Sequence, residues 1–463
     1  MSLIKSISGI RGTVGGTVGD NLTPIDVVKF TIAFAEVLYK KSRKKHLRVV
    51  IGRDARTSGK MIGDLVSGTL MSMGIDVLDT GLSTTPTVEM EVVFQQADGG
   101  IIITASHNPA PWNGLKLLNA KGEFFSAADG ELVLQLAENN SVSFSEINQL
   151  GNYTAVDDAI KRHVEAITKL KEVNVRAIKK AGITVSVDCV NSTGGIAVLE
   201  LLKALCVDNI VALYCTPNGK FPHNPEPLPE HITELSSSMK EWKSDIGFAV
   251  DPDVDRLVIV QEDGEVFGEE YTLVAVADYI LQQTKGNTVS NLSSSQALKV
   301  VSQQYDVQYY ASAVGEVNVV EMMKKVDAVI GGEGNGGVIY PKLHYGRDAL
   351  VGIALLLTYM AKSGLTVSQI RNKYPNFHIS KNRLELDANM DIDAIFSHIK
   401  ELYKQYNIID VDGIRIDFEN QWVHLRKSNT EPIIRIYAES NSKVAADNLA
   451  QKIISDVKQY CKQ

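Results

Sequence analysis

Short apolar runs alternate with amphipathic segments along roughly the first 370 residues of the chain. The runs that predict strands lie at 47–52, 100–106, 183–190, 245–251 and 327–333, and the segments with helical spacing lie at 27–41, 59–74, 195–206 and 347–364. Such alternation is typical of parallel α/β units, in which a helix connects one strand to the next. The pattern therefore predicts an α/β fold for this part of the chain.

The pattern changes near residue 370. Strand-like runs at 382–387, 412–418, 422–428 and 433–440 combine with helical segments at 391–406 and 443–461, which predicts an α+β domain with antiparallel strands. Because 463 residues exceed what one hydrophobic core supports, we expect three similar α/β domains with mixed sheets and a smaller C-terminal α+β domain. Their expected boundaries are 1–153, 154–256, 257–369 and 370–463.

Charge and composition exclude several classes of partner. The net charge is −8, and the longest basic block, at 40–48, fits the end of the helix expected at 27–41, where cations complement the helix dipole. The N-terminus lacks the apolar core of a signal peptide, and the apolar helix at 349–361 is too short to span a bilayer. The four cysteines lack metal-ligand or disulfide spacing. We therefore expect a soluble, cytoplasmic monomer or homodimer that binds neither nucleic acid nor membrane.

A hydroxyl follows directly on one buried strand, in the segment IIITASHNP at 101–109. The β-branched residues predict a strand covered on both faces, and Asn108-Pro109 disfavours a helix after it. Ser106 is therefore expected on a tight loop at the carboxyl end of the strand, which is where ligands bind in open α/β sheets. An isolated Ser-His-Asn is more often a turn cap, so the other motifs must decide.

Three carboxylates alternate just after another strand, in DPDVD at 251–255. Asp251, Asp253 and Asp255 would repel one another unless a cation held them, and a compact set of oxygen ligands suits Mg²⁺. Two alternatives stay open at this point. The segment is also compatible with an acidic turn, and it matches the pattern of aspartyl-phosphate phosphatases, in which Asp251 would be the nucleophile.

A group of phosphate-binding side chains is expected near the C-terminus, in LRKSNTEPIIRIYAE at 425–439. Guanidinium, hydroxyl, amide and backbone N–H donors flanked by strands suit a phosphate dianion. The donors are Arg426, Ser428, Asn429, Thr430 and Arg435. A plain β-hairpin with surface arginines is the alternative.

A glycine-rich loop at 331–337 lets the backbone approach a ligand closely, and Glu333 and Asn335 are its side chains able to bind sugar hydroxyls. Such a loop is weak evidence by itself. Near the strand ends of the first domain lie Arg11, Arg53 and Lys116, and each of these is individually more often a surface cation than a catalytic group.

Taken in order and spacing, TASHNP, DPDVDR, the GGE-x-x-G loop and RKSNTEP resemble the motifs of the α-D-phosphohexomutases, a family that includes phosphoglucomutases, phosphomannomutases and phosphoglucosamine mutases. The resemblance covers the whole chain, with one motif in each domain. It implies four domains around a central cleft, and a phosphoserine at Ser106 whose oxygen completes a Mg²⁺ site with Asp251, Asp253 and Asp255.

The same resemblance implies roles for the remaining motif residues. Glu333 and Asn335 would contact the sugar, while the 426–435 donors would hold the phosphate that is not reacting. Arg11 and Lys116 match positions that assist proton transfer, and His107 neighbours the phosphoserine. A hexose bisphosphate would be the intermediate and activator.

Two departures from the family pattern concern the sugar-binding loops. Many members have Glu-x-Ser-Gly-His where this chain has Glu333-Gly334-Asn335-Gly336-Gly337, so Gly337 is expected to leave vacant the space of a histidine. The loop at 314–318, VGEVN, has also lost a cation.

The resemblance implies an intramolecular phosphotransferase acting on a small hexose phosphate. Asn335 and Glu333 favour glucosamine 6-phosphate and glucosamine 1-phosphate, with phosphoglucomutase/phosphomannomutase activity as the alternative. Two more distant alternatives are the aspartyl phosphatase, which lacks a downstream Gly-Asp-x-x-x-Asp here, and a non-catalytic sugar-phosphate sensor.

Overall fold

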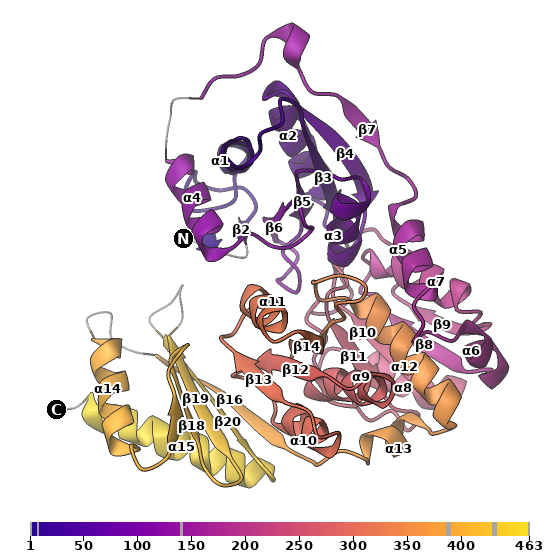
Figure 1. The fold of residues 1–463 in the computed structure, drawn as a ribbon, viewed down its shortest axis with the longest axis vertical. Helices are drawn as coiled ribbons and strands as arrows, with labels where there is room; N and C mark the ends of the chain where they lie inside the picture. Colours follow the sequence, from indigo (N-terminus) through magenta and orange to yellow (C-terminus); the bar gives the residue numbers. More distant parts are fainter. Residues whose placement is uncertain (1, 7–8, 139–141, 386–389, 428–432, 462–463) are drawn as a thin grey trace. The chain divides into compact units, whose positions relative to one another are not determined.

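The computed structural model describes the chain except residues 1, 7–8, 139–141, 386–389, 428–432 and 462–463 (Figure 1). It divides into two compact units. The first comprises Met1–Gln283 with Asn335–Arg371, and the second comprises Thr284–Gly334 with Asn372–Gln463. Among the described helices, none combines the length and the apolar character needed to cross a membrane.

The N-terminal part of the first unit contains a mixed seven-stranded sheet in the order β1-β2-β6-β5-β3-β4-β7. Its strands are β1 (Ile4–Ser6), β2 (Gly9–Thr13), β3 (Leu47–Arg53), β4 (Ile75–Leu82), β5 (Gly99–Ile103), β6 (Trp112–Asn119) and β7 (Tyr153–Ala155). The expected strands at 47–52 and 100–106 are confirmed as β3 and β5, which pair in parallel. Strand β6, which no apolar run in the sequence predicted, pairs with β5 and β2 in the antiparallel sense.

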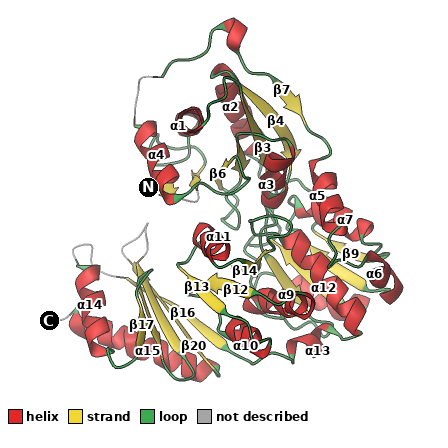
Figure 2. Cartoon of the chain, viewed as in Figure 1, coloured by secondary structure: helices red, strands yellow, loops and turns green. Residues whose placement is uncertain are grey.

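Helices cover both faces of this sheet (Figure 2), and alternate residues of β3 and β5 belong to two different hydrophobic cores. Ile101 and Ile103 belong to a core with α1 (Pro24–Lys41), α2 (Gly59–Ser72) and α4 (Ala127–Ala137), whereas Ile102 belongs to a core with α3 (Thr85–Phe94). This two-sided burial explains why the strand is apolar at successive positions rather than at alternate ones. It fixes the end of β5, and therefore the start of the loop that contains Ser106.

Local sequence explains where α1 begins and ends. The Thr23 side chain accepts a hydrogen bond from the backbone N–H of Asp26, the Asp26 carboxylate accepts one from the backbone N–H of Thr23, and Pro24 occupies the first turn. Lys40 and Lys41 lie in the last turn, as expected for the start of the basic block.

The first unit also contains a four-stranded sheet in the order β11-β10-β8-β9. Its strands are β8 (Thr184–Asp188), β9 (Asn209–Leu213), β10 (Ile246–Val250) and β11 (Leu257–Val260). Strand β10 is buried at every position and pairs in parallel with β8 and antiparallel with β11. The short connection between β10 and β11 holds the three aspartates of the DPDVD motif.

Helices complete this part of the first unit. They are α5 (Ala159–Thr168), α6 (Val175–Ala181), α7 (Gly194–Ala204), α8 (Thr233–Trp242), α9 (Glu269–Gln283), α12 (Ala349–Ser363) and α13 (Val367–Arg371), with β15 (Gly337–Ile339) preceding α12. Helix α12 is buried from Ala349 to Met360. The Asp348 side chain caps its N-terminus, and Gly364, in the left-handed conformation, ends it.

The second unit contains parallel strands β12 (Asn287–Asn291), β13 (Tyr309–Ser312) and β14 (Ala328–Glu333) with helices α10 (Ala297–Gln304) and α11 (Glu316–Lys325). It also contains an antiparallel sheet in the order β16-β20-β19-β18-β17. The strands are β16 (His378–Glu385), β17 (Asn407–Ile409), β18 (Ile414–Asp417), β19 (Trp422–Lys427) and β20 (Ile433–Ser440). Helices α14 (Ile392–Leu402) and α15 (Lys443–Tyr460) share its core, as predicted for an α+β domain.

The orientation of α2 against the N-terminal sheet can be tested by substitution. Leu70 is fully buried, while Met61 on the same helix is 42% exposed. We expect Leu70→Ala to lower the free energy of unfolding by about 2–5 kcal/mol, because it removes buried methyl groups and leaves a cavity. Met61→Ala, the matched control, should change it by less than about 0.5 kcal/mol. Urea unfolding followed by circular dichroism measures both, and equal effects would contradict the assigned orientation of α2.

Candidate active site

Ser106 lies three residues beyond the end of β5, on the loop predicted from the sequence. Its φ is +48°, a left-handed conformation that non-glycine residues adopt uncommonly and that recurs at functional sites. The backbone N–H of Ser106 donates a hydrogen bond to Thr104 Oγ1 at 2.8 Å. The loop thus holds the Ser106 hydroxyl in one direction in a nearly buried position.

Arg56 stabilises this loop through hydrogen bonds to its backbone. Its guanidinium donates hydrogen bonds to four backbone carbonyl oxygens, those of Ser106, Asn108, Pro109 and Trp112. The Asp54 carboxylate in turn accepts hydrogen bonds from Arg56 Nε at 3.0 Å and from Thr104 Oγ1 at 2.7 Å. Both members of this ion pair are almost completely buried.

Arg56 was not among the residues that the sequence motifs indicated, whereas its neighbour Arg53 was. Arg53 is partly buried, and its guanidinium donates to the carbonyl oxygen of Asp54. The available signal was the spacing Asp54-Ala55-Arg56, because a carboxylate two residues before an arginine can fix the guanidinium locally. That spacing does not indicate which distant backbone the guanidinium would bind.

The three aspartates are fully buried and meet Ser106 directly. Ser106 Oγ donates a hydrogen bond to Asp251 Oδ2 at 2.6 Å, although 145 residues separate them in the sequence. Asp251 Oδ1 accepts hydrogen bonds from the backbone N–H groups of Asp255 and Arg256. The sequence prediction that these motifs share one site is therefore consistent with the geometry of the first unit.

Two cations from separate elements neutralise the aspartates. Lys116 Nζ, from β6, lies 2.6 Å from Asp253 Oδ2 and 2.9 Å from Asp255 Oδ2. The Arg347 guanidinium, just before α12, donates to Asp255 Oδ2 at 2.8 Å. Burial alone would lower the pKa of Lys116, but the two carboxylates raise it above its usual value. Lys116 is therefore a cation in this arrangement.

The aspartates themselves differ in proton affinity. Burial raises the pKa of Asp251 well above its usual value, and the charges of Asp253 and Asp255 raise it further. Burial also acts to raise the pKa of Asp255, but Arg347 and Lys116 outweigh it and hold that pKa below its usual range. Asp255 therefore stays ionised, while Asp251 Oδ2 accepts the hydrogen bond of the Ser106 hydroxyl.

The donor atoms of the aspartates fit a hard divalent cation. One ligand oxygen from each of Asp251, Asp253 and Asp255 lies within 4.8 Å of the others. Asp253 Oδ1 and Asp255 Oδ1 are buried and accept no hydrogen bond from the described residues. Buried carboxylate oxygens without donors are costly unless a cation binds them. An all-oxygen set of this kind suits Mg²⁺.

His107 and Arg11 lie beside the Ser106 loop. His107 Nδ1 is 3.3 Å from Ser106 Oγ. Burial lowers the pKa of His107 well below its usual value, and the charges of Arg256 and Arg11 lower it further, so the imidazole is neutral at neutral pH. Arg11 Nη1 donates a hydrogen bond to Asn108 Oδ1 at 3.2 Å, which ties β2 to the same loop.

The expectation that Gly337 leaves a vacant space was wrong. A Cβ atom built on Gly337 would lie 2.3 Å from Arg347 Cδ, so the Arg347 side chain already occupies the region beside the glycine. The absence of a side chain at position 337 is what lets Arg347 pass toward Asp255. Asn335 Oδ1 accepts a hydrogen bond from the backbone N–H of Gly337 at 3.3 Å and thus contributes to the shape of its own loop.

In the second unit, Glu333 ends β14 and is nearly buried. Glu333 Oε1 accepts hydrogen bonds from Asn291 Nδ2 at 2.9 Å and from the backbone N–H of Gly315 at 3.1 Å. Its carboxylate therefore orders the loop at 314–318, whose sequence departs from the family pattern.

Arg426 and Arg435 face each other across strands β19 and β20. Arg426 Nε lies 2.8 Å from Asp412 Oδ2, and Arg435 is exposed. Like charges directly opposite each other destabilise a sheet, so a bound anion would stabilise this pair. The other three predicted donors, Ser428, Asn429 and Thr430, lie outside the described residues.

Comparison with known families finds matches along nearly the whole chain. Residues 3–142, 161–264 and 268–377 match the α/β/α domains I, II and III of phosphoglucomutase/phosphomannomutase, and residues 383–455 match its C-terminal domain.

Two curated relatives and one solved structure are similar over nearly their full length. A phosphoglucomutase/phosphomannomutase of Thermococcus kodakarensis is 34% identical over 94% of this chain and 95% of its own. A phosphoglucosamine/phosphogalactosamine mutase of Sulfurisphaera tokodaii is 30% identical over 98% of each. The crystal structure of a phosphoglucomutase/phosphomannomutase family protein from Burkholderia thailandensis has the same fold, with a TM-score of 0.84, 23% identity and coverage of 99% of this chain and 97% of that one.

The domain matches and the identity to full-length relatives lead to one conclusion. This chain belongs to the phosphoglucomutase/phosphomannomutase family, the α-D-phosphohexomutases, and is an enzyme of the isomerase class.

Proposed function

We propose that this enzyme moves a phosphoryl group between the 6- and 1-positions of a hexose phosphate through phosphorylated Ser106. The observation that carries the proposal is the 2.6 Å hydrogen bond from Ser106 Oγ to Asp251 Oδ2, within a buried group of carboxylates and cations. A phosphoryl group on Ser106 would be placed among groups that suit a metal-bound phosphate.

In the first half-reaction, the bond between Ser106 Oγ and phosphorus breaks as a sugar hydroxyl oxygen bonds to the phosphorus. The hydroxyl loses its proton, and Ser106 Oγ gains one. In the opposite step, when Ser106 Oγ takes up a phosphoryl group, His107 is the neutral base within 3.3 Å that accepts the hydroxyl proton, while Lys116 keeps its charge and stabilises negative charge near the aspartates. The bisphosphorylated sugar then returns its other phosphoryl group to Ser106 in the reverse sense.

Asp251, Asp253, Asp255 and an oxygen of the group on Ser106 would hold the Mg²⁺. When bound, the ion neutralises charge on the transferring phosphoryl group. The buried Asp253 Oδ1 and Asp255 Oδ1, which lack hydrogen-bond donors among the described residues, support this assignment.

Arg426 and Arg435 are proposed to bind the phosphate that is not reacting. Their positions on neighbouring strands bring two guanidinium groups to one face of the C-terminal sheet. Each isomer of the substrate would present its unreacting phosphate to this pair, so the pair would contribute to binding rather than to phosphoryl transfer.

The geometry disfavours the aspartyl phosphatase alternative. A nucleophilic Asp251 would need an oxygen directed at the substrate, but Asp251 Oδ2 binds the Ser106 hydroxyl and Oδ1 accepts two backbone hydrogen bonds. A non-catalytic sensor would have no use for a strained, nearly buried serine beside three carboxylates.

Glucosamine phosphate is the proposed sugar, with glucose or mannose phosphate as the alternative. One relative is named for phosphoglucosamine and phosphogalactosamine, and another for phosphoglucose and phosphomannose, so both remain candidates for this chain. The Glu333 carboxylate would favour an ammonium group over a hydroxyl at the second carbon of the sugar.

The proposal is tested by Ser106→Ala. We expect it to abolish turnover and to remove a mass increment of about 80 Da, that of one phosphoryl group, from the peptide at 101–109. Ser237→Ala, on an exposed face of α8, is the matched control and should retain both. Turnover in Ser106→Ala, or phosphate found on Asp251, would overturn the proposal.

The Arg56 contacts generate a second prediction. Arg56→Lys replaces a planar guanidinium by a single ammonium group, which cannot bind four carbonyl oxygens in the same geometry. We expect kcat to fall at least about tenfold, the result of roughly 1.4 kcal/mol less transition-state stabilisation, with KM changed less. Arg53→Lys should leave kcat within about twofold of the wild type, and an equal loss in the two variants would exclude a specific role for Arg56.

The sugar preference is tested with a panel of 1-phosphates and 6-phosphates of glucosamine, glucose and mannose. We expect kcat/KM to be highest for glucosamine phosphate. Asn335→Ser should narrow that preference by on the order of tenfold, because a shorter side chain changes both the loop hydrogen bond to Gly337 and the donors offered to the sugar. A preference for glucose or mannose phosphate would overturn the sugar assignment and leave the phosphoserine mechanism intact.

A further inference from the structure

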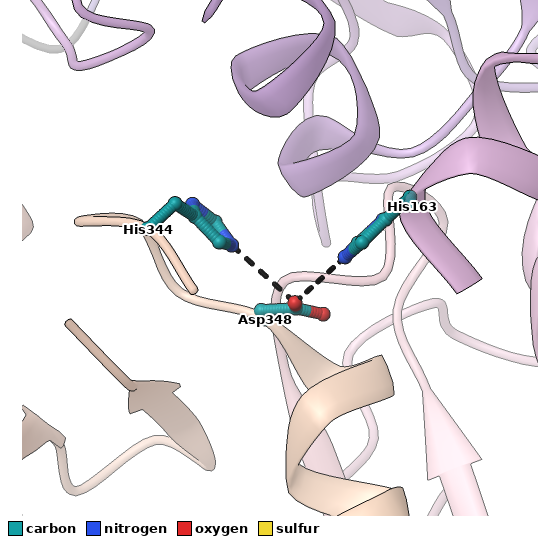
Figure 3. A group of neighbouring side chains, drawn as sticks. All are labelled: His163, His344 and Asp348. Carbon is teal, nitrogen blue, oxygen red and sulfur yellow. Dashed lines mark hydrogen bonds and ion pairs between the residues drawn. The ribbon is translucent and has the colours of Figure 1, made fainter. Parts of the chain in front are cut away.

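A second group of potential ligands lies in the first unit, apart from Ser106 and the three aspartates. It consists of His163 on α5, His344 in the connection between β15 and α12, and Asp348 at the N-terminus of α12. The Nε2 atoms of His163 and His344 lie 2.9 Å and 3.3 Å from the same oxygen, Asp348 Oδ2 (Figure 3). The two imidazole rings are nearly perpendicular, with an interplanar angle of 89°.

We propose that His163, His344 and Asp348 bind a transition-metal dication, with Zn²⁺ as the best fit. Their three ligand atoms lie within 4.8 Å of one another. Ligands at about 2.0–2.1 Å from a tetrahedral Zn²⁺ are about 3.3 Å apart, which is close to the 2.9 Å and 3.3 Å that separate the two imidazole nitrogens from Asp348 Oδ2. Two imidazole nitrogens with one carboxylate oxygen are a common donor set for zinc.

The other polar atoms of the three ligands lie close to neighbouring polar groups. His163 Nδ1 lies 2.9 Å from Thr87 Oγ1, and His344 Nδ1 lies 3.3 Å from Glu89 Oε2. Asp348 Oδ1 accepts hydrogen bonds from the first backbone N–H groups of α12. Outer contacts of this kind orient the ligands of metal sites and select which ring nitrogen binds.

The Glu89 carboxylate packs against the segment that contains His344 and Asp348. A Cβ atom on Gly346 would lie 1.8 Å from Glu89 Oε2, so the glycine allows the carboxylate to pack against the 344–348 segment. Glu89 and Asp348 together bring two negative charges into a buried region. A dication would balance both.

The donor chemistry separates this site from the aspartate site. The three aspartates offer only oxygen ligands, and these suit Mg²⁺. His163 and His344 offer imidazole nitrogens, which are poor ligands for Mg²⁺. The side chains of His163 and Asp348 are fully buried, while the His344 side chain is 10% exposed. Three protein ligands leave one position of a four-coordinate ion for water.

A metal ion at this position would have a structural consequence for the neighbouring site. It would join α5 to the 344–348 segment, and that segment contains Arg347, which binds Asp255 at 2.8 Å. The proposed ion would therefore position Arg347 without touching the substrate.

The test uses the full chain, freed of metal with a chelator and returned to excess Mg²⁺ so that the aspartate site is occupied. Zn²⁺ is then titrated in competition with a chromophoric chelator, and X-ray absorption identifies the atoms bound to it. We expect one tightly bound Zn²⁺ per chain, coordinated by nitrogen and oxygen without sulfur. The absence of sulfur excludes adventitious binding to the four cysteines.

Variants locate the bound ion. His344→Gln should weaken Zn²⁺ binding by on the order of a hundredfold or more, because it removes a ligand. His46→Gln, at an exposed histidine outside the group, should bind Zn²⁺ as the wild type does. Ser106→Ala should also bind it normally, which makes this test independent of the phosphoserine mechanism.

Two outcomes would overturn the proposal. If the wild type binds no Zn²⁺ tightly in the presence of Mg²⁺, His163, His344 and Asp348 form a hydrogen-bonded ion-pair network. If Zn²⁺ binds but His344→Gln leaves its affinity unchanged, the ion lies elsewhere. The wild-type absorption spectrum decides the ligand type even if a variant fails to fold.

Discussion

The burial of three carboxylates in one short loop is the constraint on which the active site depends. Asp251, Asp253 and Asp255 are fully buried, and buried charges persist only when paired. Lys116 from an antiparallel strand and Arg347 from the segment before α12 supply the compensating charges. The loop between β10 and β11 is therefore joined electrostatically to the N-terminal sheet and to the N-terminus of a buried helix.

The position of Ser106 follows from a second buried ion pair. Asp54 fixes Arg56, and Arg56 binds the backbone that follows β5, including the carbonyl oxygen of Ser106. This support balances the cost of a left-handed conformation at a non-glycine residue, which is of order 1–3 kcal/mol. A hydroxyl held in one direction needs little reorganisation to react, and such preorganisation is a general source of catalytic rate.

The N-terminus of α12 connects the two groups of charged residues. Arg347 extends past Gly337 to Asp255, while the adjacent Asp348 meets His163 and His344. Successive residues thus bind different sites, because adjacent side chains of an extended segment point in opposite directions. The missing histidine of the glycine loop and the presence of Arg347 are parts of one local arrangement, since a side chain at position 337 would collide with the arginine.

The sequence by itself determined the local elements and the chemical groups. Apolar periodicity predicted β3, β5, β10 and α2, because burial on one or two faces requires a repeating pattern. Alternating aspartates indicated a metal site and a strand-end serine indicated a ligand-binding loop, because these patterns are local, whereas a phosphoryl-transfer role for both was implied by the resemblance of the motifs to those of the phosphohexomutases. Only the tertiary structure decided that Arg56 holds the serine loop, that β6 brings Lys116 to the aspartates and that His163 meets Asp348 across 185 residues. Such pairings depend on how distant surfaces pack, and no local pattern in the sequence encodes them.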